Sequence, residues 1–535
     1  MGSPLIKATG SALPKAAKYD TIERSKSSQN KLRSQLFTPL ILSHMILKAR
    51  KIAIKVGQKY IIVLNEHAAH ELDVHAGDRL AVQNGSRRIT CIVDITENGG
   101  LKNNEAGLYI ETWDTLKADR GDKMFVTLAE KPAANMYIRQ KLDGKELNKA
   151  EIDTIVKDIV SDSLTDVEMT YFVSACYING LSDRETTDLT KSIVEHGNRI
   201  KLNKKIVADK HCIGGVPGNR TTMVVIPIIA AAGITIPKTS SRAITSPSGT
   251  ADTMEVMCNV TNNAEKLKQI LEKVGAFITW GGGVDLAAAD DKLIRVRHPM
   301  SLDPKGMMLA SIMAKKYAVG STHVLIDIPY GPQVKTSTLE KANELKKDFE
   351  RLGKMLGMTV KVIATRGDAP IGRGIGPVLE AIDVLEVLEN KPEAPQDLRK
   401  KAIFMASELL ELCGKCKKGT GAAFAEKLLV SGAAFKKMNE IIDAQGRKKI
   451  PKLGKFTFNV VAKKSGKIVA VDNKLVSHVA RVAGAPKNPG SGVRIEKNLG
   501  DKVKKGDLLY TIFAENPGRL KNGIEASADK VYTIK

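Results

Sequence analysis

The sequence has few cysteines, few aromatic residues and no long apolar run. Its 535 residues include six scattered cysteines, too few for a disulfide framework and typical of a reducing compartment. Aromatic residues make up 4% of the chain, which leaves little material for stacking nucleic-acid bases. No apolar segment approaches the ~18 residues that a membrane span needs. We therefore expect neither a membrane protein nor, as the main activity, a nucleic-acid-binding protein.

Acidic residues are also scarce relative to basic ones. Lys and Arg number 83 against 59 Asp and Glu, which gives a formal net charge of +24. Such a charge is typical of a lysine-rich solvated surface, but it also draws phosphate and nucleotides toward clefts. Nucleic-acid binding requires similar charge, so the charge alone leaves these alternatives open. At this length, with 43% hydrophobic residues, the chain can form two to four domains.

Local patterns separate an unusual beginning from two domains. Residues 1–44 are basic and without periodicity, so we expect a disordered extension. A transit peptide, or a start extended beyond Met45, fits the same composition. Short strands between turn signals predict a β-barrel-like domain over 46–130, with strands at Lys51–Val56, Tyr60–Leu64, Arg79–Gln83 and Ile89–Val93. Helical periodicity and two capping boxes, Thr165…Glu168 and Ser182…Glu185, predict a helical domain over 131–202, with a further contribution from about 296–320.

Strand and helix patterns alternate over residues 203–454, which predicts a largely parallel central sheet flanked by helices. The expected strands are Ile206–Ala208, Val324–Ile328 and Thr359–Ala364. The expected helices are Met223–Ala232, Ala264–Val274 and Thr338–Leu356, the last opened by Ser337. Short strands with glycine turns predict a C-terminal α+β domain over 455–535. The expected fold class is therefore multidomain α/β.

The first candidate segment is a glycine-rich run between a predicted strand and an apolar helix. Three glycines interrupt Asp209–Thr222, and glycines let backbone N–H groups approach an anion closely. The helix start would add donors and a favourable dipole, and Lys210 and Arg220 would add positive charge. A tight turn with no ligand fits the glycines equally well. The run matches neither a Walker loop nor a dinucleotide-binding turn.

The second candidate segment, Lys238–Glu255, is rich in hydroxyl side chains. Seven Ser and Thr residues precede Asp252, with Arg242 among them. Hydroxyls and arginine suit phosphate oxygens and ribose hydroxyls, because they donate hydrogen bonds in several directions. A polar surface loop is the alternative, although neighbouring Ile, Met and Val residues indicate that the segment is anchored.

Two further segments carry weaker signals. Asp303 precedes a proline, a pattern also typical of an Asx-type turn, while Ser311 and Lys315 are spaced to share one helix face. Cys413 and Cys416 form a single Cys-x-x-Cys pair. No second pair exists to complete a zinc site, so we expect neither metal nor redox function there.

Together, the second and third segments resemble the thymidine phosphorylase family. Its characteristic run is Ser-Gly/Ser-Arg-Gly/Ala-aliphatic, then small residues and Gly-Thr-x-Asp-x-aliphatic-Glu. Ser240–Glu255 follows this run except at Pro247 and Ser248. The resemblance covers about residues 46–535. It is strongest to the archaeal-type AMP phosphorylase branch. Members of this branch have an additional N-terminal domain, and residues 46–130 resemble that domain.

The resemblance implies roles at matching positions. Asp303 would donate the proton to the departing base, which requires burial or anionic neighbours that favour its protonated form. The nucleotide site would be formed by Gly215, Ser241, Arg242, Ala243, Ile244, Thr245, Ser246, Thr250, Ser311 and Lys335. Contacts to phosphate or to other parts of the substrate would come from Lys210, His211, Ser240 and Lys315.

Two residues depart from the family pattern. Cys212 stands where Ser is common, and a thiol is a weaker hydrogen-bond donor. Arg220 stands where Lys is frequent, which keeps the charge but changes the donor geometry.

The implied reaction is phosphorolysis, in which AMP and inorganic phosphate would give adenine and ribose 1,5-bisphosphate without metal or other cofactor. The sequence does not rank AMP against CMP or UMP. The family implies a homodimer or larger homo-oligomer, here expected in the cytoplasm unless residues 1–44 are a transit peptide. The rivals are a thymidine or uridine phosphorylase, a Mg²⁺-dependent phosphoribosyltransferase, and a nucleic-acid-binding protein with an inactive enzyme core.

Overall fold

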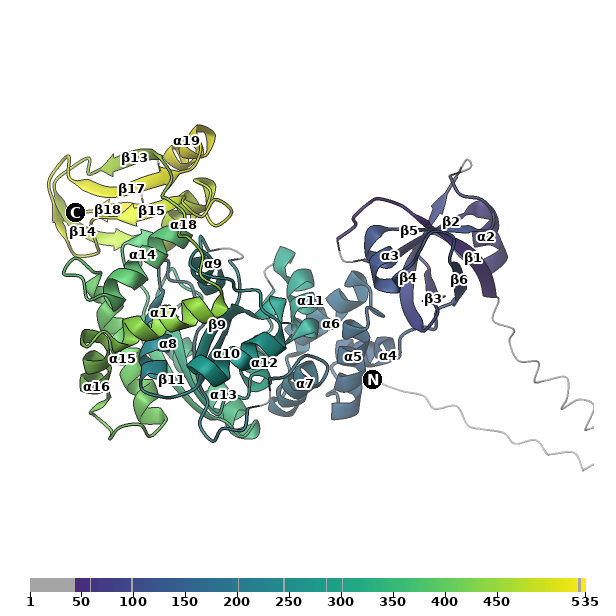
Figure 1. The fold of residues 1–535 in the computed structure, drawn as a ribbon, viewed down its shortest axis with the longest axis horizontal. Helices are drawn as coiled ribbons and strands as arrows, with labels where there is room; N and C mark the ends of the chain where they lie inside the picture. Colours follow the sequence, from purple (N-terminus) through teal and green to yellow (C-terminus); the bar gives the residue numbers. More distant parts are fainter. Residues whose placement is uncertain are drawn as a thin grey trace, which may run out of the picture. The chain divides into compact units, whose positions relative to one another are not determined.

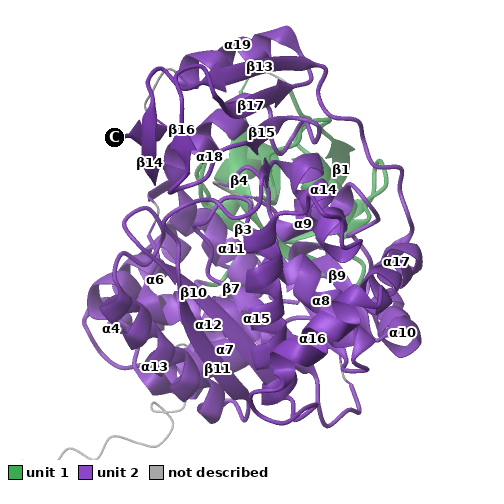
Figure 2. Cartoon of the chain, turned by 90° about the vertical axis from the view of Figure 1, so that its left-hand side faces the viewer, with its two compact units in different colours: residues 1–130 green, residues 131–535 purple. Residues whose placement is uncertain are grey.

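The computed structural model describes residues 44–57, 59–97, 100–200, 202–243, 246–284, 286–300, 302–527 and 531–535. The chain divides into two compact units, Met1–Glu130 and Lys131–Lys535, which Figure 2 colours separately. Of the predicted extension 1–44, only His44 lies within the described residues, and it begins the first strand. No helix among the described residues is long and apolar enough to cross a membrane.

The first unit contains a closed barrel with the strand order β1-β5-β2-β4-β3-β6. Its core includes Leu47, Ile62, Leu80 and Val93, all nearly inaccessible to solvent. The strands are β1 (His44–Lys51), β2 (Ile61–Asn65), β3 (Arg79–Asn84), β4 (Arg87–Thr96), β5 (Glu105–Leu108) and β6 (Lys123–Leu128), and the helices are α2 (Glu66–Leu72) and α3 (Ile110–Leu116).

The strand predicted at Lys51–Val56 is wrong, whereas those predicted near residues 60, 79 and 89 correspond to β2, β3 and β4. In the structure, the strand nearest to that prediction is β1, and it ends at Lys51. The alternation of buried and exposed side chains that sustains a strand occurs earlier, at Leu47 and Ala49, while Ile54 is exposed.

The second unit begins with helices that form one apolar core. Both predicted capping boxes, at Thr165 and Ser182, are confirmed. Helices from later in the chain, α11 and α12 among them, contribute buried residues to this core, and α12 lies within the predicted contribution from about 296–320. The helices are α4 (Ala134–Leu142), α5 (Lys149–Val160), α6 (Asp166–Asn179), α7 (Asp183–Glu195), α11 (Ala288–Arg297) and α12 (Lys305–Ala318).

Parallel strands form the centre of the α/β part, as predicted. One sheet has the order β11-β10-β7, a second pairs β8 with β9, and a bridge between Val207 and Thr235 links the two. The strands are β7 (Ala208–Cys212), β8 (Ile236–Ser240), β9 (Ala276–Trp280), β10 (His323–Tyr330) and β11 (Thr359–Arg366). The helices are α8 (Thr221–Ala231), α9 (Thr250–Glu255), α10 (Ala264–Val274), α13 (Leu339–Met355), α14 (Pro377–Leu388), α15 (Gln396–Leu412), α16 (Gly421–Val430) and α17 (Ala433–Gln445).

Two local predictions in this part are corrected. The strand expected at Ile206–Ala208 begins at Ala208 and continues to Cys212, so Lys210 and His211 are strand residues rather than loop residues. The N-cap of α13 is Thr338, whose hydroxyl accepts from the Lys341 N–H, and not Ser337.

Helix α8 determines where the glycine-rich run lies. Ten of its residues, Thr221 to Ala230, are buried, as expected for a helix that is apolar on all sides. It packs against β7, β8 and β9 and against α15, α16 and α17 (Figure 1). Its first turn is therefore held at the carboxyl end of β7, where ligands bind in open parallel sheets.

The C-terminal part consists of two antiparallel sheets with helices α18 and α19. One sheet has the order β12-β15-β17-β13, and its strand β12 lies just before α14, which ties this part to the α/β part. The other has the order β16-β14-β18. The elements are β12 (Gly374–Ile375), β13 (Phe456–Val461), β14 (Gly466–Val471), α18 (Asn473–Val482), β15 (Gly492–Ile495), β16 (Lys502–Val503), β17 (Leu508–Ala514), α19 (Pro517–Ala526) and β18 (Tyr532–Ile534).

Candidate active site

The glycine-rich run forms the turn from β7 to α8. Gly214, Gly215 and Gly218 all have φ in the left-handed region that favours glycine. A Cβ on Gly215 would lie 3.0 Å from the backbone nitrogen of Lys335, so this close approach needs a residue without a side chain. The structure thereby brings together two predicted nucleotide-site residues, Gly215 and Lys335, that are far apart in sequence. Both are exposed.

Arg220 connects this turn to the hydroxyl-rich run. Its guanidinium donates to the Thr250 hydroxyl at 3.0 Å and to the Ser248 carbonyl at 2.8 Å. Its Nε forms an ion pair with the carboxylate of Glu380, which is 1% exposed. Arg220 is itself buried, so its charge is committed to Glu380, contrary to the expectation that it adds charge for a ligand.

No sequence pattern indicated Glu380. It lies on α14, 160 positions after Arg220, and resembles an ordinary helical glutamate in the sequence. In the structure its carboxylate accepts from Arg220, from the Thr253 hydroxyl at 3.0 Å and from the Gly376 N–H at 3.2 Å. Burial raises the pKa of Glu380, and the Arg220 charge opposes that shift.

The acidic residues of the hydroxyl-rich run hold its backbone in place. Asp252 accepts from the backbone N–H groups of Ala243 at 2.7 Å and Gly249 at 2.8 Å. Glu255 forms a two-pronged ion pair with Arg242, whose guanidinium also lies 4.9 Å from the Trp280 ring centroid. The Arg242 side chain therefore anchors the loop. A nucleotide contact from this position would come from the backbone.

The remaining residues of this run are open to solvent to different degrees. Ser240, at the end of β8, is half-buried, while Ser241 and Ser246 are exposed. Thr250 is half-buried at the first turn of α9 and accepts from Arg220. The predicted site residues Ile244 and Thr245 lie outside the described residues.

Ser311 and Lys315 share one face of α12, as their spacing predicted, and they share a partner. Both donate to Asp290 Oδ2 at 2.7 Å, and Asp290 is 2% exposed on α11. The neighbouring carboxylates raise the pKa of Lys315 against the effect of its burial. Sequence reasoning missed Asp290, although the Asp-Asp pair at the start of α11 offered a signal.

Asp303 lies in the segment between α11 and α12. Its carboxylate is 46% exposed and forms an ion pair with Arg297 at 3.2 Å. The burial that the proton-donor role requires is therefore not present in this structure.

Buried charge is concentrated on β7 and β8. Burial lowers the pKa of His211 to well below its usual range, and Lys316, Lys238 and Lys210 lower it further. The imidazole is therefore neutral. Burial raises the pKa of Cys212, which remains a thiol and accepts from the Asn219 side-chain amide at 3.5 Å. Cys212, which stands where Ser is common in the family pattern, thus acts as a hydrogen-bond acceptor inside the loop.

Comparison with known proteins matches this arrangement to domain families over most of the chain. Residues 135–197 match the helical bundle domain of a glycosyl transferase family, and 204–435 match its a/b domain. Residues 467–535 match the pyrimidine nucleoside phosphorylase C-terminal domain. An AMP phosphorylase of Methanococcoides burtonii is 42% identical, over 91% of this chain and 96% of that protein. The chain belongs to the thymidine and pyrimidine nucleoside phosphorylase family.

Other relatives in this phosphorylase family are similarly close. An AMP phosphorylase of Pyrococcus furiosus is 44% identical, over 86% of this chain and 92% of that protein. A Legionella pneumophila (strain Paris) protein, provisionally named a thymidine phosphorylase, is 40% identical over 90% of this chain and 94% of its own. Among solved structures, anthranilate phosphoribosyltransferase of Thermus thermophilus overlaps 58% of this chain and 99% of its own, with 16% identity and a TM-score of 0.49.

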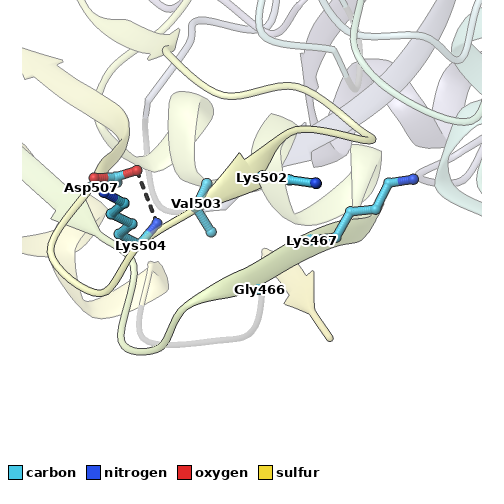
Figure 3. Close-up of a pocket in the computed structure, with 6 residues that line it drawn as sticks. All are labelled: Gly466, Lys467, Lys502, Val503, Lys504 and Asp507. Atoms are coloured by element: carbon cyan, nitrogen blue, oxygen red, sulfur yellow. Dashed lines mark hydrogen bonds between the residues drawn. The ribbon is translucent and has the colours of Figure 1, made fainter.

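Two other features of this phosphorylase family member lie apart from the predicted site. A cavity of about 690 Å³ in the C-terminal part is lined by Gly466, Lys467, Lys502, Val503, Lys504 and Asp507 (Figure 3). None of these residues belongs to the candidate segments. Cys413 and Cys416 are both free, and among the described residues no group of three or more His, Cys, Asp or Glu is arranged to hold a metal.

Proposed function

We propose that this protein cleaves nucleoside 5'-monophosphates with inorganic phosphate, so that AMP and phosphate give adenine and ribose 1,5-bisphosphate. The observation that carries the proposal is the near full-length similarity to AMP phosphorylases, at 42% and 44% identity. The matched span includes most of the barrel unit. The site geometry supports it, since the glycine turn, the anchored hydroxyl run and the buried lysines all suit anionic ligands.

The proposed mechanism assigns a task to each part of the site. Breaking the N-glycosidic bond builds positive charge on the sugar and negative charge on the base. Lys210 and His211 on β7 and Ser240 at the end of β8 would position phosphate for attack on C1. Gly215, Lys335 and the backbone of the hydroxyl run would hold the nucleotide. Ser311 and Lys315, both held by Asp290, would be positioned from α12.

Asp303 would protonate the leaving base in this scheme. Its ion pair with Arg297 must open for this to occur, because the side chain has to be free to reach the base and donate a proton. An incoming phosphate group competes for that guanidinium, because arginine binds phosphate and carboxylate in the same way. We therefore infer that substrate binding releases Asp303 from Arg297.

Substrate comparison tests the proposal against its rivals. With phosphate present, AMP should release free base at least about a hundredfold faster, by kcat/KM, than adenosine or thymidine, because charge-assisted contacts to the 5'-phosphate are lost with a nucleoside. CMP and UMP are assayed alongside to rank the bases. Free base and ribose 1,5-bisphosphate are measured by chromatography.

Each rival gives a different result in the same assay. Base release from thymidine but not from AMP would identify a nucleoside phosphorylase, the activity named for the Legionella relative. Dependence on Mg²⁺ and a pyrophosphorylated ribose would identify a phosphoribosyltransferase. Salt-sensitive RNA binding without base release from any substrate would favour the nucleic-acid-binding alternative.

An exposed apolar face supports assembly into a homodimer or larger homo-oligomer. On α6, Val167, Tyr171 and Ile178 are 63%, 55% and 73% exposed and lie on one side of the helix. Met136 and Leu142 of the adjacent helix α4 are also exposed. Light scattering after size exclusion should give at least a dimer mass. A Tyr171→Lys/Ile178→Lys variant should give a monomer, and an unchanged mass would remove this face from the interface.

A further inference from the structure

Lys238 is a buried lysine on β8 for which the proposed mechanism has no use. Its ammonium lies 3.5 Å from Asp209 Oδ1, and the ammonium of Lys316, from α12, lies 3.2 Å from the same oxygen. The three side chains are at most 5% exposed. Two ammonium groups therefore share one carboxylate oxygen in the interior of the protein.

Two residues of this arrangement, Asp209 and Lys238, lie on the strands that carry predicted phosphate residues. Side chains along a strand alternate, so residues two apart face the same way. On β8, the next residue on the face of Lys238 is Ser240, and on β7, the next on the face of Asp209 is His211. Ser240 and His211 therefore each lie two residues beyond the Lys238–Asp209 ion pair on their own strands, toward the loops.

A second pair of lysines adds to the charge at this end of β7. Lys210 lies 3.9 Å from Asp327, and Lys401 of α15 lies 3.0 Å from the same carboxylate oxygen. Among the described residues, these four lysines form ion pairs with just two carboxylates, Asp209 and Asp327. This cluster thus has two more cationic side chains than anionic ones. Buried charge without a partner is unfavourable, so the empty site favours either proton loss or an arriving anion.

We propose that Lys238 is a positioning residue for the phosphate co-substrate. A phosphate dianion bound at His211 and Ser240 would balance the positive charge of Lys238. The inference rests on the proposed function and deepens it. Lys238 does not touch phosphate. Its field, acting through the low-dielectric interior, strengthens the hold of the half-buried His211 and Ser240 on a dianion.

Proton binding by Lys238 accompanies anion binding. Burial lowers the pKa of Lys238 to about 7, and Lys316 and Lys210 lower it while Asp209 raises it. The packed elements α8 and β9 bring no titratable side chain to this cluster. Above that pKa, Lys238 is deprotonated in the empty site, and it takes up a proton when an anion binds. Anion affinity is therefore greatest below about pH 7 and falls as the pH rises.

Sulfate tests this coupling, because it is a dianion that does not itself titrate near neutral pH. Calorimetry in two buffers of different ionisation heat reports the protons taken up. At about pH 8 the wild-type protein should take up close to one proton per sulfate, and affinity should fall by up to about tenfold per pH unit. Lys238→Met should abolish both effects and raise the KM for phosphate about tenfold, with the KM for AMP within about twofold.

Lys238→Arg separates charge from titration. Arginine keeps the positive charge but does not lose its proton, so this variant should retain the phosphate KM and lose the proton uptake. If Lys238→Met fails to fold, the loss of proton uptake in Lys238→Arg still tests whether Lys238 is the group that binds the proton. Lys141→Met is the matched control, since Lys141 is 3% exposed but forms an ion pair one-to-one with Glu185 at 2.7 Å in the helical part. Its phosphate KM should be unchanged.

Two results would overturn the role of Lys238. One is a wild-type phosphate KM in Lys238→Met, and the other is proton uptake that persists in Lys238→Arg, which would assign the proton to His211. Sulfate binding needs no turnover, so the two proposals fail separately. If sulfate binds with Lys238-dependent uptake but no substrate releases base, the proposed function is wrong while the anion role of Lys238 remains.

Discussion

Asp303→Asn should lower kcat for AMP phosphorolysis by about 10²- to 10⁴-fold, the contribution typical of a positioned general acid. Asparagine cannot donate the proton that the departing base needs, although it preserves the shape of the side chain. AMP binding should remain within a few-fold of wild type, because Asp303 is half exposed and its ion-pair partner is Arg297 rather than a part of the nucleotide loops. Steady-state kinetics with AMP, and equilibrium binding of AMP without phosphate, measure the two quantities.

The matched control for this substitution is Asp162→Asn. Asp162 forms an ion pair with Lys292 of α11 at 2.6 Å, just as Asp303 does with Arg297 at the end of the same helix. Its φ of 56° is one that asparagine tolerates. The control removes one carboxylate that pairs with a cation of α11 and should keep kcat within about twofold, as expected of a part-exposed ion pair. Turnover by Asp303→Asn at the level of this control would end the proton-donor assignment.

Arg220→Met should destabilise the second unit by about 3–5 kcal/mol, the usual cost of removing one partner from a buried ion pair. The substitution leaves the Glu380 carboxylate buried with only the Thr253 hydroxyl and the Gly376 N–H as donors. It also removes the donors to Thr250 and Ser248, so the hydroxyl-rich run loses its link to the glycine turn. Thermal and urea midpoints measure the stability, and the KM for AMP reports on the loop.

The pH dependence of the Arg220→Met variant identifies the cause. Burial already raises the pKa of Glu380 above its usual value, and loss of the Arg220 charge raises it further. A carboxyl whose folded-state pKa is raised binds more protons when folded, so stability declines as the pH rises through the window above its unfolded pKa. The variant should therefore approach wild-type stability in acidic buffer and diverge from it toward neutral pH. A penalty independent of pH would contradict the role of Glu380.

A double variant separates folding from binding. In Arg220→Met/Glu380→Met, both partners are replaced by apolar side chains, which is often close to neutral for stability. The double variant should regain most of the lost stability but not the KM for AMP, because Thr250 and Ser248 still lack their donor. Arg399→Met is the control for an ordinary pair, since its partner Glu426 is 40% exposed. It should cost no more than about 1 kcal/mol.

Local patterns predicted the elements that carry the site, with small errors at their ends. Periodicity and capping residues located α6, α7 and α10, and short runs between turn signals located three strands of the barrel, β2, β3 and β4. The boundary at β7 was the consequential error. The hydrophobic signal at Ile206–Ala208 marks only the start of that strand, because the polar residues that follow are buried by ion pairs rather than by apolar contacts.

The sequence by itself determined the family and the alternation of strands and helices, and it predicted the candidate anion-binding segments, because these depend on residue type and spacing along the chain. Only the tertiary structure decided how those segments are used. From the sequence, the positive charges of Arg220 and Arg242 were expected to be available to a ligand. In the fold, Arg220 forms an ion pair with Glu380 and Arg242 forms one with Glu255. Lys238 acquires its importance from Asp209 and Lys316, which come from two other elements. Burial and long-range pairing set the charge of each group, and neither is encoded in local spacing.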